Sequence, residues 1–393
     1  MDTTESFRGL ACTGCGATFD PDHLDRCPDC EAPLAPEYDY GAVPDDPAEL
    51  DGGSGAWRYD ALLPFPAASA VTISEGDTPL VDAPRLADEL ETGEVLVKDE
   101  SRNPTGTILD RGLSLAVTAV AAFGGDDPEP LALATPGNAG QSAAAYAGRA
   151  DLRSYAFVPS RAPFSNKAMI NVHGGEMRVV GGRYPDALAA VSDQLATDWT
   201  SLQEFTNPYR HEGAKAVAYE ILADRDWEVP DAVVTPVGTG EVVVGLAAGF
   251  RSAVEAGWVA ETPRLFAVQP EGCAPVVEAF ASGAETTDPV EHPDTIVGEL
   301  EIPDPAGGNL ALAALDEFDG GAVAVEDESI LRSAVTAAGS EGVEMGAAGG
   351  ASAAGAWELA DEFDADATVA LVNTESGGKT ADVLRSHLMG QGI

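Results

Sequence analysis

Residues 232–254 read AVVTPVGTGEVVVGLAAGFRSAV, and this stretch decides the fold. It begins with a short run rich in β-branched residues, passes through a turn with two glycines and continues as an Ala- and Val-rich segment. The run is typical of a buried strand and the segment of a helix, so the stretch predicts a strand, a turn and a helix in succession. Backbone N–H groups of such a turn converge on a point that suits an anion, although a tight turn without a ligand has the same composition.

The same alternation of short apolar runs and longer Ala-rich segments extends along the chain from about residue 94. Strands are expected at residues 94–98, 131–134, 154–158, 176–180, 232–236, 264–269, 322–325 and 367–373. Helices are expected at residues 110–122, 141–149, 184–197, 209–223, 242–254 and 328–338. This alternation predicts an α/β fold with a mostly parallel sheet that helices cover on both faces. Ligands bind such folds beyond the carboxyl ends of the strands, so the strand-to-helix turns are the candidate sites.

The charge of the chain is strongly negative. Its 393 residues include 21 Lys plus Arg and 66 Asp plus Glu, which gives a formal net charge of −45. The acidic residues are spread along the chain, whereas a binding surface for a basic partner would concentrate them. We therefore expect an acidic solvation layer, adapted to a cytoplasm of high salt in which repulsion is screened. The same charge argues against nucleic acid as a partner, because the phosphate backbone would be repelled.

The sequence contains no membrane or export signal of the usual kinds. No apolar run approaches the roughly 20 residues that span a bilayer. The first residues, MDTTESFRGL, contain neither the basic nor the apolar region of a signal peptide. We therefore expect a soluble protein of the cytoplasm that has no membrane partner.

Four of the five cysteines form two C-x-x-C pairs, Cys12 with Cys15 and Cys27 with Cys30. Such pairs present four thiolates to one zinc ion at about 2.3 Å, and a segment this short buries too little core to fold without it. Two disulfides are the alternative, but they are rare in a reducing compartment. The sequence therefore predicts a structural zinc site. The fifth cysteine, Cys273, is expected to be a small packed residue.

The composition changes after the cysteine pairs. Residues 31–56 are rich in Pro, Gly and Asp, which is typical of a linker. We predict a zinc ribbon over residues 1–36, a linker over 37–56 and a main domain over 57–393, with a smaller lobe near 126–201. In this division the ribbon is dispensable for the folding of the main domain, because the predicted core lies elsewhere.

Seven short motifs follow one another along the main domain. They are WRYDALLP at 57–64, EGDTPL at 75–80, NPTG at 103–106, GN at 137–138, NPYRHEGAK at 207–215, PVGTG at 236–240 and TESGGK at 374–379. On these motifs the chain resembles the threonine synthases over residues 56–390. The resemblance implies a two-lobed pyridoxal-phosphate enzyme of the tryptophan-synthase-β fold, which is fold type II. Archaeal-type members of this family often carry a zinc ribbon in front.

The resemblance also implies an activity. Threonine synthases convert O-phospho-L-homoserine and water into L-threonine and phosphate. The segments Trp-Arg-Tyr and Leu-Leu-Pro at the start of the main domain favour this activity over that of the related serine and threonine dehydratases. Cysteate synthase, which acts on phosphoserine, remains an alternative that the motifs separate poorly.

Roles for individual residues follow from the same resemblance. The cofactor contacts that it implies are Asn138 at the ring hydroxyl, Thr374 at the ring nitrogen, and Gly238, Thr239, Gly240, Glu241 and Val242 around the phosphate. Arg210 matches the arginine that binds the substrate phosphate, a role for which a guanidinium fork is well shaped. Thr107, in the place of the serine of the family's lysine motif, is the second residue expected at the substrate.

One position breaks the family pattern. The family holds its cofactor through a Schiff-base lysine, and Leu109 stands at that position in the segment TILDRG. The chain has four lysines, and each matches a lysine that the family has elsewhere: Lys98, Lys167, Lys215 and Lys379. None of them is therefore a displaced nucleophile.

Two further departures concern the cofactor site. Glu241 stands where the family's phosphate loop has glycine or another small residue. A carboxylate about 4 Å from one phosphate charge costs about 4 kcal/mol at an effective dielectric constant near 20. Glu375 and Ser376 replace a glycine and a histidine of the family's last motif. These replacements put cofactor binding in question as well as catalysis.

Two functions remain open at the level of the sequence. The first is a threonine synthase, which the resemblance along the chain favours and Leu109 opposes. The second is a non-catalytic relative that binds an amino acid or a phosphorylated amino acid, as a homodimer or paired with an active paralogue. A positioned proton carrier is worth about 10²- to 10⁴-fold in rate, and leucine supplies none, so the chemistry favours the second.

Overall fold

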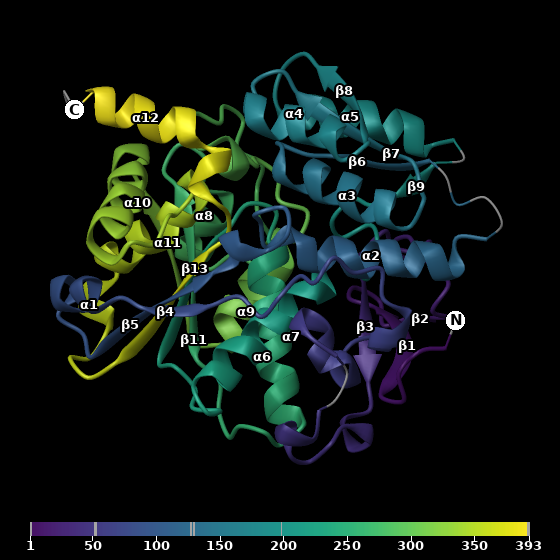
Figure 1. Ribbon diagram of the computed structural model, residues 1–393, viewed down its shortest axis with the longest axis horizontal. Helices are drawn as coiled ribbons and strands as arrows, with labels where there is room; N and C mark the ends of the chain where they lie inside the picture. Colours follow the sequence, from purple (N-terminus) through teal and green to yellow (C-terminus); the bar gives the residue numbers. More distant parts are fainter. Residues whose placement is uncertain (1, 51–52, 126–127, 129, 198, 391–393) are drawn as a thin grey trace. The chain divides into compact units, whose positions relative to one another are not determined.

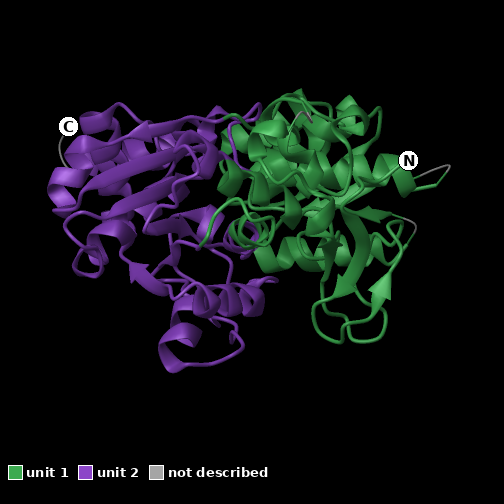
Figure 2. Cartoon of the chain, turned by 90° about the horizontal axis from the view of Figure 1, so that it is seen from below, with its two compact units in different colours: residues 1–77, 109–219, 248–260 green, residues 78–108, 220–247, 261–393 purple. Residues whose placement is uncertain are grey.

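The computed structural model describes residues 2–50, 53–125, 128, 130–197 and 199–390 (Figure 1). The described chain divides into two compact units, which Figure 2 colours separately. Unit 1 comprises Met1–Asp77, Leu109–Tyr219 and Ala248–Ala260, and unit 2 comprises Thr78–Ile108, Glu220–Ala247 and Glu261–Ile393. Both units combine helices with parallel strands, which confirms the predicted α/β class.

Unit 2 is built on a sheet whose described strands follow the order β12-β11-β10-β13-β5-β4. The strands are β4 (Leu80–Asp82), β5 (Glu94–Asp99), β10 (Ala232–Pro236), β11 (Arg264–Pro270), β12 (Gly321–Val325) and β13 (Thr368–Asn373). Neighbouring strands are parallel except for β4 and β5. The central strands are nearly continuous apolar runs, because both faces of a parallel sheet are buried. The carboxyl ends of β5, β10 and β13 therefore meet at one edge of the sheet.

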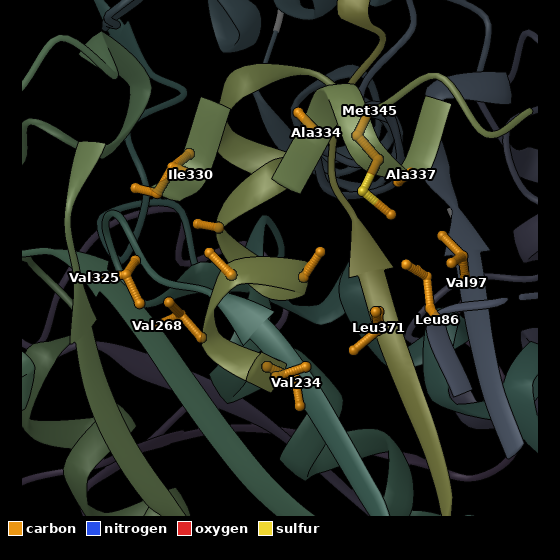
Figure 3. Close-up of a cluster of buried hydrophobic side chains, with 14 of the residues drawn as sticks. Leu86, Val97, Val234, Val268, Val325, Ile330, Ala334, Ala337, Met345 and Leu371 are labelled. Atoms are coloured by element: carbon orange, nitrogen blue, oxygen red, sulfur yellow. The ribbon is translucent and has the colours of Figure 1, made fainter. Parts of the chain in front are cut away.

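The helices that lie wholly in unit 2 are α1 (Pro84–Leu90), α8 (Pro275–Ser282), α9 (Gly308–Glu317), α10 (Asp327–Glu341), α11 (Ala347–Glu358) and α12 (Ala381–Gly390). Helix α11 approaches its neighbours closely. A Cβ at Gly355 would lie 2.2 Å from Val268 of β11, and a Cβ at Gly350 would lie 2.6 Å from the Ile330 carbonyl of α10. Figure 3 shows the apolar cluster in this region, with Leu86, Val97, Val234, Val325, Ala334, Ala337, Met345 and Leu371 labelled.

Unit 1 contains a second parallel sheet, whose described strands follow the order β8-β7-β6-β9. These strands are β6 (Leu131–Ala134), β7 (Ser154–Pro159), β8 (Glu176–Val180) and β9 (Thr200–Ser201). The helices are α2 (Leu109–Phe123), α3 (Asn138–Arg149), α4 (Phe164–Val172) and α5 (Tyr184–Leu195). Leu113 and Val117 of α2 pack with Tyr146 of α3 and with β6 in one buried cluster. Two more helices, α6 (Lys215–Asp224) and α7 (Glu241–Glu255), contain residues of both units.

The cysteine-rich segment of unit 1 forms an antiparallel sheet with the described order β2-β1-β3. Its strands are β1 (Phe7–Cys12), β2 (Thr18–Phe19) and β3 (Leu34–Tyr38). Phe7 and Leu34 of this sheet belong to the same buried cluster as Trp57, Phe65 and Tyr209. The segment therefore shares its core with the rest of unit 1.

Short 3-10 helices complete the described structure at Tyr40–Ala42, Pro47–Glu49, Gly55–Leu62, Ala67–Ser69, Glu100–Arg102, His211–Ala214, Gly298–Leu300, Ala360–Glu362 and Gly377–Lys379. Of the helices in the described part of the chain, none combines the length and the apolar character that a membrane crossing requires.

Candidate functional site

The turn from β10 to α7 lies at the carboxyl edge of the unit 2 sheet. Gly240 has a φ of +93°, and a Cβ there would lie 2.9 Å from the carbonyl of Gly307. The N–H of Gly307 donates to the carbonyl of Thr239 at 2.9 Å, which joins the two loops. A Cβ at Gly238 would lie 3.1 Å from the carbonyl of Glu299. Close backbone packing therefore requires the glycines of this turn, whether or not a ligand is bound.

Acidic side chains surround this turn. Glu241 and Val242 begin α7, and only 4% of the surface of Glu241 is exposed. A carboxylate in the first helical turn is favoured by the helix dipole, so Glu241 takes the electrostatic position that an anionic ligand would use. The Oε1 atom of Glu299 is buried and has no hydrogen-bond partner among the described residues. Burial and the nearby charge of Glu375 raise the pKa of Glu299 to about 8. At neutral pH Glu299 is therefore protonated, and Glu241 is the acidic group that disfavours a phosphate at this turn.

The last motif follows β13 at the same edge of the unit 2 sheet. The carbonyl of Thr374 accepts a hydrogen bond from the N–H of Ile108 at 2.9 Å. Thr107 and Glu375 pair across an isolated antiparallel bridge, and the side chain of Glu375 is fully buried. The structure therefore places the backbone segment of Thr107 and Ile108 beside that of Thr374 and Glu375, at the edge that also carries the β10–α7 turn.

Leu109 begins α2 in unit 1, and its partly buried side chain packs against the apolar cluster of α2, α3 and β6. The next residue, Asp110, is fully buried and accepts a hydrogen bond from the Ser142 hydroxyl at 2.6 Å. A Cβ at Gly213 would lie 2.3 Å from the backbone of Arg111, so this glycine packs directly against the first turn of α2. The leucine is thus a packing residue at the start of a tightly packed helix.

Two of the four lysines of the chain form buried ion pairs. The Nζ atom of Lys98 lies 2.8 Å from a carboxylate oxygen of Glu220 in unit 2, and both side chains are buried. Lys215 forms a second buried ion pair, at 3.1 Å in unit 1, and burial lowers its pKa. Lys167 donates to a backbone carbonyl at 2.9 Å, and Lys379 is buried in unit 2. The ion pairs hold Lys98 and Lys215 as structural groups, whereas Lys379 lies near enough to Glu299 for its charge to lower the pKa of that carboxyl.

The turn after β6 in unit 1 leads into Asn138, the first residue of α3. Gly137 has a φ of +155°, and a Cβ there would lie 2.6 Å from Nδ2 of Asn166 in α4. Asn166 exposes 1% of its surface, and neither Nδ2 nor Oδ1 has a hydrogen-bond partner among the described residues. Buried amides are normally bonded, so Asn166 marks a candidate ligand contact. The sequence gives no signal for Asn166, because it belongs to none of the motifs.

Arg210 lies in unit 1 and is buried. Its Nη1 atom donates to Oε2 of Glu204 at 3.0 Å and to the carbonyl of Leu202 at 2.8 Å. The guanidinium is therefore bound by groups of the protein itself. Glu204 was not expected as a site residue, although it stands only six residues before the arginine in the sequence.

The four cysteines of the two pairs converge. Their Sγ atoms all lie within 4.8 Å of one another, with 3.3 Å between Cys12 and Cys30 and 3.7 Å between Cys15 and Cys27. These separations exceed the disulfide length of about 2.05 Å. They are near the spacing of about 3.8 Å between ligands in a tetrahedral site with bonds of about 2.3 Å. The backbone N–H of Cys15 donates to the sulfur of Cys12 and lowers its pKa to about 6. The arrangement therefore fits one metal ion.

Comparison with known proteins defines the class first. A family model described as pyridoxal-phosphate dependent enzyme matches residues 71–375. An L-serine ammonia-lyase from Rhizomucor miehei shares the fold with a TM-score of 0.68 and 20% identity, over 79% of this chain and 97% of its own. Maize serine racemase has a TM-score of 0.66 and 17% identity, over 80% and 94%. The chain therefore has the fold of pyridoxal-phosphate dependent enzymes of fold type II.

Two sequence relatives define the family more narrowly. The threonine synthase of Methanosarcina acetivorans is 33% identical over 370 residues, which cover 93% of this chain and 90% of that protein. The threonine synthase of Methanocaldococcus jannaschii is 32% identical over 378 residues, which cover 94% and 93%. The chain belongs to the threonine synthase family.

Pyridoxal phosphate is the cofactor that this family membership implies. The residues present do not fit a cofactor held through a lysine and through its phosphate. In unit 1 an apolar side chain, Leu109, stands at the start of α2 and packs into the core. In unit 2 the first residue of α7, directly after the β10–α7 turn, is the buried Glu241, whose carboxylate disfavours a phosphate there.

Proposed function

We propose that this chain is a non-catalytic member of the threonine synthase family that binds an amino acid. Leu109, packed against the core of unit 1, is the observation that carries the proposal. Proton transfer between the carbons of a bound amino acid needs a group that gains and loses a proton near neutral pH. Leucine has no such group, and the buried ion pairs of Lys98 and Lys215 support the view that neither amine replaces it.

An active threonine synthase is the second candidate. Identity of about one third along nearly the whole chain supports it. Glu241 at the β10–α7 turn and the leucine at position 109 oppose it. A relative acting on phosphoserine or a dehydratase-like enzyme is a weaker candidate, because it meets the same two obstacles.

An assay with the family's substrate decides between these candidates. The purified chain is incubated in high salt with O-phospho-L-homoserine and pyridoxal phosphate, and threonine and phosphate are measured. The threonine synthase of Methanosarcina acetivorans, assayed in parallel, is the positive control. We expect no threonine above the protein-free reaction. Turnover would refute the non-catalytic proposal and establish the second candidate.

We further propose that one zinc ion is bound by Cys12, Cys15, Cys27 and Cys30, whose converging sulfurs support this assignment. A closed set of four thiolates is typical of a structural site. Metal analysis of protein purified without chelator should give one zinc per chain. Protein that contains no zinc would contradict the proposal.

The cellular setting is also proposed. The net charge of −45 supports a cytoplasm of high salt as the working compartment. A homodimer or a pair with an active paralogue is the expected assembly, which sedimentation of the chain alone and mixed with such a paralogue would test.

A further inference from the structure

Arg210 and its neighbours form a closed polar cluster in unit 1. Arg210 exposes 2% of its surface and Glu204 exposes 3%. Besides Arg210 Nη1, two donors reach the same carboxylate. The hydroxyl of Tyr184 donates to Oε1 of Glu204, and Nε2 of Gln203 donates to Oε2 at 2.5 Å. Three donors therefore converge on one buried carboxylate.

The orientation of these donors is fixed by further contacts. The Oε1 atom of Gln203 accepts a hydrogen bond from the N–H of Ala134 at 2.8 Å, so its Nε2 must face Glu204. Nε2 of Gln203 also lies 3.0 Å from the Tyr184 hydroxyl, and Arg210 is held at the Leu202 carbonyl. Burial and the charge of the neighbouring Glu204 raise the pKa of Tyr184, which keeps its hydroxyl protonated as a donor. A guanidinium, an amide and a hydroxyl arranged in this way are the donors of an oxyanion site.

We infer that Glu204 fills this anion position, and that the ligand of the chain is an amino acid without a phosphate group. The inference rests on the proposed function, in which the chain binds an amino acid. A phosphate could reach Arg210 only if the carboxylate of Glu204 moved away. That carboxylate is held by three donors and is almost completely buried. A phosphate placed beside Glu204 would instead meet a like charge at short range. The expected ligand is therefore an unphosphorylated amino acid such as L-homoserine or L-threonine, and not O-phospho-L-homoserine.

The first experiment tests the anion position without any amino acid. Glu204→Ala removes the carboxylate and leaves Arg210, Gln203 and Tyr184 around a vacant position. We expect its thermal unfolding temperature to be lower than that of the unmodified chain in chloride, and to rise with inorganic phosphate, since an anion bound to the folded state stabilises it. The unmodified chain should show no such rise. The control Glu204→Ala with Arg210→Leu lacks the guanidinium and should not respond either.

Equal responses of the three proteins to phosphate would overturn the inference, because the anion position would then not depend on Glu204 and Arg210. If Glu204→Ala does not fold, a second measurement on the unmodified chain decides. Titration calorimetry in a chloride buffer without phosphate compares the dissociation constants of L-homoserine and O-phospho-L-homoserine. We expect the unphosphorylated amino acid to bind at least tenfold more tightly. Equal or tighter binding of the phosphorylated one would overturn the inference and leave the proposed function standing. If neither amino acid binds, the proposed function fails and the inference about its ligand fails with it, whereas the phosphate response of Glu204→Ala, where that variant folds, separately decides whether Glu204 fills an anion position.

Discussion

At the scale of single residues, Asn166 is a buried amide without a hydrogen bond among the described residues. An unsatisfied buried polar group costs about 1–3 kcal/mol. Asn166→Leu has nearly the same shape and removes that cost, so we expect the free energy of unfolding to rise by about 1–2 kcal/mol. Urea unfolding of the ligand-free protein measures this change. If Asn166 contacts the ligand, the same variant loses the stabilisation that L-homoserine gives to the unmodified chain.

Asn207 provides a matched control for this prediction. It is also buried in unit 1, but its Oδ1 accepts a hydrogen bond from the N–H of Tyr209 at 3.1 Å. Asn207→Leu should therefore lower the free energy of unfolding by about 1–3 kcal/mol. If both variants lowered the free energy of unfolding, the amide of Asn166 would be hydrogen-bonded in the folded protein.

Leu109 leads to a prediction about the cofactor. The unmodified chain should show no visible absorbance that borohydride fixes to the protein, because no amine is present at position 109. Leu109→Lys alone should bind pyridoxal phosphate weakly. Leu109→Lys with Glu241→Gly should bind it at least about tenfold more tightly, because the second change removes a charge beside the phosphate and lets the turn approach it.

The control for this series is Glu241→Gly alone, which lacks the amine and should give no reducible absorbance. Full binding by Leu109→Lys alone would show that Glu241 does not repel the phosphate. Reducible absorbance in the unmodified chain would show that one of its own lysines reacts, and would contradict the assignment of position 109.

Glu299 leads to a prediction about pH. The folded chain keeps a proton on Glu299 up to about pH 8, whereas the ordinary value is 4.5. Between these two values the folded state binds more protons than the unfolded state, so stability is lost as the pH rises. Glu299→Gln should match the unmodified chain near pH 4.5 and exceed it by roughly 1–3 kcal/mol at pH 8, less than the full shift because the residue is partly exposed.

Urea unfolding at pH values between 4.5 and 8 tests this prediction. Glu285→Gln, at an exposed position, is the control and should leave the pH dependence unchanged. A constant difference between Glu299→Gln and the unmodified chain across this range would show that Glu299 is ionised in the folded state.

At the scale of elements, the cysteine-rich segment carries the main revision. The sequence favours a ribbon that can be removed, yet Phe7 and Leu34 pack with Trp57 and Tyr209 in one cluster. The hydroxyl of Tyr209 also donates to the carbonyl of Pro21 at 2.6 Å. Each large apolar side chain uncovered by a deletion loses about 1.5–3 kcal/mol. We therefore expect a chain without residues 1–36 to unfold at a clearly lower temperature than the full chain, which calorimetry measures.

Removal of the metal should act on the same element. A chelator is expected to lower the unfolding temperature of the full chain, and zinc should restore it, because a metal bound only by the folded state stabilises that state. The variant Cys273→Ala, which alters the cysteine outside the two pairs, should respond to chelator like the unmodified chain. Insensitivity of the full chain to chelator would show that the cluster holds no exchangeable metal.

The elements themselves were predictable where the apolar pattern is regular. The strand expected at 232–236 is β10, and the helix expected at 242–254 is α7, which begins one residue earlier. The helix expected at 209–223 begins only at Lys215, because the preceding residues His211–Ala214 form a 3-10 turn at close range to α2. Helix α11 was not predicted, since its sequence AAGGASAAGAWE has no polar face and is buried on all sides.

At the scale of the whole molecule, the net charge leads to a prediction about salt. The Debye length falls from about 10 Å at 0.1 M to about 3 Å at 1 M ionic strength, so repulsion among the acidic groups is screened. We expect the unfolding temperature to rise between these concentrations of potassium chloride. The same series with sucrose in place of salt is the control, because sucrose is excluded from the protein surface but does not screen charges. An unfolding temperature that does not depend on salt would contradict adaptation to a salty cytoplasm.

The sequence by itself determined the class of fold, the family and the cysteine cluster. These features depend on local patterns: β-branched runs before glycine turns, ordered motifs, and cysteines two residues apart. The sequence alone also predicted that Leu109 stands at the position of the family's lysine, because that match needs only the order of the residues around it.

Only the tertiary structure decided what surrounds these residues. Glu204 lies next to Arg210 in a closed cluster because Tyr184, from the start of α5, and the loop after β9 meet there. Asn166 has no hydrogen-bond partner in the described part of the chain because α4 packs it against Gly137, which lies 29 positions earlier in the chain. Contacts between segments far apart in sequence, and the satisfaction of buried polar atoms, depend on how helices and strands pack. No local pattern records that packing, so the tertiary structure alone decides which charges and amides remain available to a ligand.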